Sequence, residues 1–203
     1  MGTFLSIHIK SNNQSQITKL LQELSDADDM TNGLYPKDFY ENIIPNENAA
    51  PTYLVVSNAE NGWIHVDINS FKKLHKWLEQ ISKELNTSVI QILGQTVSDA
   101  YYFLMYENGV LRREIDIYHG DFEITTDIGE KFSFEKKSLI PENEEDYDNL
   151  FDIDSIAEYC SALGFDLFHD RSQESFFVLR KETSHKTLKQ ITSLSNKPWW
   201  KFW

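Results

Sequence analysis

The predicted fold is decided by residues 53–93, which read YLVVSNAENGWIHVDINSFKKLHKWLEQISKELNTSVIQIL. The segment opens with two runs rich in apolar and β-branched residues, 53–56 and 63–68. The polar stretch between them ends at Gly62, and glycine tolerates the positive φ of a hairpin turn. The two runs therefore predict a β-hairpin.

The rest of this segment changes from the two-residue repeat of a strand to the spacing of a helix. The apolar helical positions are Phe71, Leu74, Leu78, Ile81 and Leu85. We expect Asn69 or Ser70 to cap this helix, because a short polar side chain can accept hydrogen bonds from the free amides of a first turn. Residues 89–93 then form a short apolar run that predicts a further strand.

The N-terminal residues predict another strand and another helix. Leu5, Ile7 and Ile9 alternate with the side chains of a second face, as a half-buried strand requires. Asn12 and Asn13 precede an amphipathic helix with apolar residues at Ile17, Leu20, Leu21 and Leu24. Together with the quoted segment this gives the order strand, helix, strand, strand, helix, strand, which is the βαββαβ order of a ferredoxin-like fold.

Beyond this unit we expect the sheet to be extended and a smaller C-terminal part to follow. The expected elements are strands at 100–106 and 110–118, a hairpin within 122–134, a helix that ends at Gly164, strands at 165–168 and 176–180, and a final helix through Leu188 and Ile191. Residues 26–51 are rich in Asp, Asn and Pro and predict a long irregular loop. The sequence therefore predicts an α+β protein, with a ferredoxin-like core and extra hairpins at 1–140 and a helix-strand-strand-helix part at 141–203, packed as one globule.

The composition predicts a folded protein with a strongly acidic surface. The chain has 203 residues, of which 25% are charged, and a formal net charge of −13. Nucleic acids and anionic membranes are also negative, so this charge disfavours both as partners and favours a basic protein, although acidity can also serve solubility alone. Cys160 is the only cysteine, and no apolar run reaches the roughly 20 residues that cross a bilayer. We expect a cytoplasmic location.

One set of residues could form a chemical site on the face of the predicted sheet that points away from the helices. In the ferredoxin-like order the first and third strands are neighbours, and their polar positions then share that face. These positions are Ser6, His8, Trp63, His65 and Asp67. Histidine and aspartate together can bind a ligand or exchange protons near neutral pH. A polar sheet surface without function is the competing interpretation.

Acidic stretches form the predicted partner-binding surface. Residues 141–154 contain no basic residue, and their candidate contacts are Glu142, Glu144, Glu145, Asp146, Tyr147, Asp148, Phe151 and Asp152, while Asp26, Asp28 and Asp29 form a second candidate surface. Neither stretch has the glycine at the sixth position and the glutamate at the twelfth that complete an EF-hand loop. No phosphate-binding loop, nucleophile elbow or zinc motif occurs, so we expect no metal, no cofactor and no catalytic residue.

The C-terminal residues are unusually aromatic. They include Trp199, Trp200, Phe202 and Trp203, in a segment too short to bury these rings by itself. We expect the tail to dock on the protein's own core, and the alternative is a contact with a partner or with a second copy in a homodimer.

A compact acidic α+β protein without a reaction centre resembles the bacterial immunity proteins, which neutralise a cognate toxin by plugging its active site. The resemblance covers charge, size and α+β organisation, and no signature residues accompany it. It implies a non-enzymatic inhibitor that blocks a basic toxin or nuclease by electrostatic complementarity. The alternatives are a small-ligand-binding or enzymatic domain that uses the face around His8, His65 and Asp67, and a DNA-mimic inhibitor.

Overall fold

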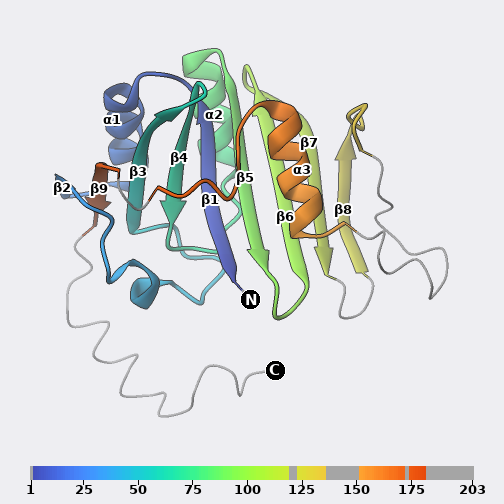
Figure 1. Cartoon of the computed structure of the whole chain (residues 1–203), viewed down its shortest axis with the longest axis horizontal. Helices are drawn as coiled ribbons and strands as arrows, with labels where there is room; N and C mark the ends of the chain where they lie inside the picture. The colour runs from blue at the N-terminus through green and yellow to red at the C-terminus, as the bar shows by residue number, and fades with distance from the viewer. Residues whose placement is uncertain (1, 119–122, 136–150, 172–173, 182–203) are drawn as a thin grey trace, which may run out of the picture.

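The computed structural model describes residues 2–118, 123–135, 151–171 and 174–181, and within them nine strands form one antiparallel sheet (Figure 1). The strands are β1 (Thr3–Lys10), β2 (Asp29–Gly33), β3 (Tyr53–Glu60), β4 (Trp63–Ile68), β5 (Ser88–Gln95), β6 (Ala100–Glu107), β7 (Val110–Tyr118), β8 (Glu123–Gly129) and β9 (Phe176–Arg180). Their order across the sheet is β2-β9-β3-β4-β1-β5-β6-β7-β8. The helices are α1 (Gln14–Ser25), α2 (His75–Leu85), α3 (Ile153–Leu163) and the short 3₁₀ helix η1 (Phe39–Asn42). The predicted α+β class is confirmed.

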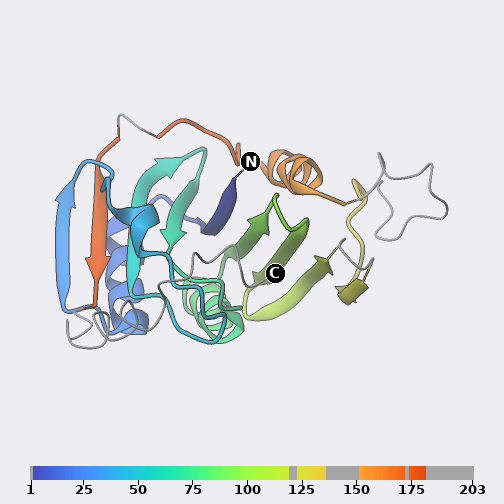
Figure 2. The same cartoon turned by 90° about the horizontal axis from the view of Figure 1, so that it is seen from below.

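Helices lie on both faces of the sheet (Figure 2), and apolar side chains are buried on each face. On one face, α1 and α2 cover the central strands and bury a cluster that includes Ile7 of β1, Ile17 of α1 and Leu78 of α2. On the other face, α3 covers β5, β6 and β7 with a second cluster that includes Phe103 and Tyr159. Because neighbouring residues of a strand point to opposite faces, β1 and β4 contribute to both layers.

The two long N-terminal helices begin for different reasons. Asn13 caps α1 as predicted, since its side chain accepts from the backbone N–H of Gln16. The prediction that Asn69 or Ser70 caps α2 is wrong, because α2 begins later, at His75. The side-chain Oδ1 of Asn69 instead accepts from the backbone amides of Thr52 and Tyr53 and so fixes the start of β3.

Strand β9 joins distant parts of the chain. It lies between β2 and β3 and pairs with both, so a C-terminal strand completes a sheet that N-terminal strands begin. The prediction of an irregular loop at 26–51 is wrong at this point, because β2 forms from polar residues with no apolar alternation. Its backbone is held by the β9 ladder, and this long-range pairing cannot be seen in its own sequence.

The hairpin predicted within 122–134 is also wrong. The structure has the single strand β8 there, which ends at Gly129. This glycine has φ +93°, and a Cβ there would lie 2.2 Å from the carbonyl oxygen of Arg112. The chain then turns back and brings Glu135 to the fully buried Arg113 in a bidentate ion pair of 2.8 and 2.9 Å.

Residues 165–168 do not form the strand that their alternation predicts. Residues 164–171, here named the crossing segment, instead run from the end of α3 across the open face of the sheet toward β9 (Figures 1 and 2). The side chain of Asp166 accepts from the backbone N–H of Phe168 and so closes a local turn in place of a sheet ladder. The predicted final helix lies outside the described residues. Among the described residues, no helix is long and apolar enough to cross a membrane.

Candidate functional site

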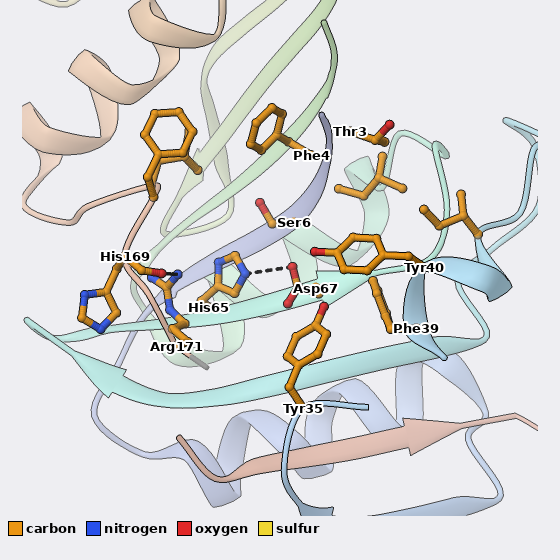
Figure 3. A pocket seen from close by; sticks show the side chains of 14 residues that line it. Thr3, Phe4, Ser6, Tyr35, Phe39, Tyr40, His65, Asp67, His169 and Arg171 are labelled. Atoms are coloured by element: carbon orange, nitrogen blue, oxygen red, sulfur yellow. Dashed lines mark hydrogen bonds and ion pairs between the residues drawn. The ribbon is translucent and has the colours of Figure 1, made fainter. Parts of the chain in front are cut away.

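A pocket of about 490 Å³ opens on the sheet face that α1 and α2 leave free (Figure 3). Its floor is formed by β1 and β4, and its two walls are the crossing segment and residues 35–43. The lining residues are Thr3, Phe4, Leu5, Ser6, Tyr35, Phe39, Tyr40, Ile43, His65, Asp67, Leu167, Phe168, His169 and Arg171. Most of these side chains are apolar or aromatic, and the polar ones lie on the floor and on the wall formed by the crossing segment.

The floor results from the pairing of β1 with β4. The register places Ser6 opposite Asp67 and His8 opposite His65, so the four side chains share one face. His65 is 9% exposed, and its Nε2 lies 3.0 Å from Oδ1 of Asp67. The structure therefore brings together the polar residues that the sequence placed on this face. Trp63 shares the face but packs against Phe165 in the α3 core, away from the pocket.

His8 lies beneath the pocket floor and is sealed from solvent. It is 1% exposed, stacks on Phe165 at 4.5 Å between ring centroids, and contacts the ring of His65 at 4.7 Å. Its Nε2 lies 3.1 Å from Oγ of Ser6. Burial, with smaller contributions from His65 and Arg171, holds the pKa of His8 well below its ordinary value. His8 is therefore a neutral packing residue at physiological pH.

One wall of the pocket is aromatic and was not found in the sequence. Phe39 is buried against Tyr53 and anchors η1 to the sheet, while Tyr35 and Tyr40 stack beside it at 6.3 Å between ring centroids. The signal available in the sequence was the cluster of three aromatic residues within 35–40, inside a stretch read as a polar loop.

The hydroxyl of Tyr35 is directed toward the floor (Figure 3). Burial and then the negative charge of Asp67 raise the pKa of this hydroxyl well above its ordinary range. The oxygen is buried and lies near Asp67 and Tyr40. This wall therefore places a neutral hydroxyl beside the carboxylate of Asp67.

The opposite wall carries Arg171 and His169, which already have acidic partners. Nη2 of Arg171 lies 3.6 Å from Oε2 of Glu60 and also donates to the backbone carbonyl of Asp166, while Nη1 donates to the backbone carbonyl of His169. His169 lies between Glu60 at 3.0 Å and Glu174 at 3.4 Å. These contacts hold the crossing segment against the end of the β3–β4 hairpin. They also place the carboxylate of Glu60 beside the positive charge of Arg171.

The predicted partner-binding residues are scattered. Asp26, Asp28 and Asp29 are exposed around the start of the edge strand β2. Phe151 was expected to be an exposed anchor, and this is wrong because it is fully buried in the α3 core. Asp152 is the N-cap of α3 and accepts from the backbone N–H of Ser155 at 2.8 Å. The other candidates, Glu142, Glu144, Glu145, Asp146, Tyr147 and Asp148, and the tail residues Trp199, Trp200, Phe202 and Trp203 lie outside the described residues.

The remaining chemical groups are separate from the pocket. Cys160 is buried in α3, and burial raises the pKa of its thiol. Over the described ranges no group of three or more His, Cys, Asp or Glu side chains is arranged to hold a metal ion. No protein-family model matches the chain, and no match was found among curated proteins or solved structures.

Proposed function

We propose that this protein is a non-enzymatic binding protein that recognises a basic protein partner, in the manner of an immunity-type inhibitor. The observation that carries the proposal is the net charge of −13 on a chain of 203 residues. Such a surplus attracts a cationic surface at long range and raises the rate of encounter.

The sheet edge at β2 supports this proposal as a contact surface. Asp26, Asp28 and Asp29 are exposed there beside two exposed apolar side chains, Met30 at 46% and Leu34 at 75%. Charges steer an encounter, whereas affinity comes mainly from apolar anchors that lose contact with water. Met30 and Leu34 supply the anchors that Phe151, being buried, cannot supply.

The test compares charge-reversal variants in calorimetric titrations against basic proteins encoded by neighbouring genes. One variant changes Asp26, Asp28 and Asp29 to lysine, and a second reverses the acidic residues within 142–148. The matched control changes Glu79 and Glu84, which are exposed on α2, to lysine. We expect at least one of the first two variants to lose about tenfold or more in affinity, which is about 1.4 kcal/mol, and to show a weaker salt dependence.

The control should change the affinity by less than about threefold, since its charges lie away from the proposed surface. Unchanged affinity and unchanged salt dependence in both test variants would reject the proposal.

A second candidate is a small-ligand-binding or enzymatic domain that uses the face around His8, His65 and Asp67. The observation in its favour is that Ser6, His65 and Asp67 line one pocket, with His65 hydrogen-bonded to Asp67. Turnover of a small substrate by purified protein, abolished in His65→Gln, would establish this candidate in place of the first.

We also infer that the first half of the fold is ferredoxin-like. The strands β3, β4, β1 and β5 lie in that order with α1 and α2 on one face, which is the arrangement of two interleaved βαβ units. The homodimer expected from the aromatic tail stays a prediction.

A further inference from the structure

We infer that the pocket over Asp67 binds a cationic nitrogen group, an ammonium or a guanidinium. Two sources share this chemistry, a lysine or arginine side chain of a protein and a free small amine. We assign the side chain of a basic protein as the occupant, and this choice of source rests on the proposed function.

The charge distribution in the pocket favours a cation. Asp67 is the only carboxylate among the lining residues, and its ion-pair partner within the described part of the chain is the neighbouring imidazole of His65. Arg171 is the one permanently charged cation of the lining, and Glu60 lies within 3.6 Å of it. Asp67 therefore faces the pocket without a permanently charged cation as its partner, whereas Arg171 on the opposite wall already has Glu60 as its partner.

The arrangement of the floor and the aromatic wall provides acceptors for a charged N–H donor. In Figure 3, Tyr35 and Tyr40 gather on the Asp67 side of the floor, whereas Arg171 and His169 lie on the far side of His65. The buried Tyr35 hydroxyl lies near Asp67. A carboxylate and a hydroxyl side by side can accept two of the three hydrogens of an ammonium group.

The aromatic rings add a second attraction. Tyrosine and phenylalanine rings attract cations through the negative charge of their faces, and the attraction grows when water is excluded. This protein already places cations over tyrosines elsewhere, with Arg180 over Tyr53 at 4.4 Å and Lys73 over Tyr102 at 4.8 Å. Phe39, Tyr35 and Tyr40 give the pocket wall the same chemistry.

The volume suits one side chain. Pockets that bind small ligands measure about 300–1,000 Å³, and about 490 Å³ accommodates a lysine or arginine side chain with part of its backbone. The apolar residues Phe4 and Leu167 can cover the methylene groups of such a side chain while its charged end reaches Asp67.

The test is a titration in which NMR monitors the ring signals of His65 and Tyr35. The probes are a short peptide with one central lysine, the same peptide with norleucine in its place, n-butylammonium as the free amine, and acetate. Norleucine preserves the shape of the methylene chain and removes the charge. We expect the lysine peptide to bind at least about tenfold more tightly than the norleucine peptide, and acetate to give no saturable shift.

Variants identify the residues responsible. Asp67→Asn should weaken lysine-peptide binding by about tenfold or more, Tyr35→Phe by about two- to fivefold, and the control Glu79→Gln, exposed on α2, by less than about twofold. Asp67→Glu preserves the charge and should recover part of the affinity. If Asp67→Asn loses its fold, the comparison of lysine with norleucine peptides on the native protein still decides the question.

Several outcomes would overturn the inference. They are equal binding of the lysine and norleucine peptides, saturable binding of acetate at the same site, and unchanged affinity in a folded Asp67→Asn variant. Tighter binding of n-butylammonium than of the peptide would overturn the assignment to a protein side chain. Basic-protein binding that survives Asp67→Asn would reject this inference alone, and peptide binding without any basic protein partner would reject the proposed function alone.

Discussion

At the scale of single residues, a sealed histidine, His8, lies beneath a pocket floor that holds the hydrogen-bonded pair of His65 and Asp67. His8 is sealed under Phe165, and the pKa of His8 is held well below 6.5 by burial. In the unfolded chain this histidine takes up a proton near pH 6.5, whereas in the folded protein it does not. Stability from this group is therefore complete above about pH 6.5 and falls as the pH drops toward the lowered pKa of the folded state.

This difference gives a measurable pH dependence. Between pH 7.5 and 5.5 the native protein should lose about 1 kcal/mol more of its free energy of unfolding than His8→Phe, which keeps the ring stack but cannot bind the proton. Denaturant unfolding of both proteins at the two pH values measures these free energies of unfolding. Parallel losses in the two proteins would show that His8 is not held neutral.

The sequence was informative about this floor because the period of a strand is two. Once Leu5 and Ile7 were placed toward the helices, Ser6 and His8 had to point the other way, and the same holds for His65 and Asp67. Tyr35 and Phe39 could not be placed this way. Their position depends on a loop that packs on β3, and such contacts have no local period.

At the scale of elements, β9 connects the crossing segment to the sheet. Leu179 of β9 is fully buried in the core shared with α1 and pairs with both Met30 and Leu54. The segment before β9 forms a pocket wall, so the strand fixes one end of that wall.

Leu179→Ala should therefore lower the free energy of unfolding by about 2–5 kcal/mol, as expected for a cavity in a packed core. Met30→Ala removes an exposed side chain at the adjacent position of β2 and should cost less than about 1 kcal/mol. Denaturant unfolding of both variants compares them. Similar small losses would show that β9 is not an integral strand of the sheet.

The elements that the sequence predicted correctly are those with strong local signals. The β3–β4 and β6–β7 hairpins have Asn-Gly turns at Asn61 and Asn108, and both asparagines take a positive φ. The elements that it missed depend on partners far along the chain. Strand β2 is polar, and its conformation depends on pairing with β9. Residues 130–135 turn back because Glu135 binds the buried Arg113.

At the scale of the whole molecule, one long sheet carries a negative field and a pocket whose only lining carboxylate is Asp67. Composition alone predicted the field, since a charge of −13 needs no structure to be counted. The pocket could not be predicted, because its walls come from residues 35–43 and from the crossing segment, which lie far apart in the sequence. If the two features serve one function, the field speeds encounter and the pocket receives a cationic side chain.

The most direct test of this account is the rate of association with a basic partner at increasing salt concentration. Stopped-flow tryptophan fluorescence measures this rate. The long-range attraction predicts a rate constant that falls at least about tenfold between 50 and 500 mM NaCl, because salt screens charges beyond a few ångströms. A rate constant that stays the same across this range would contradict the account.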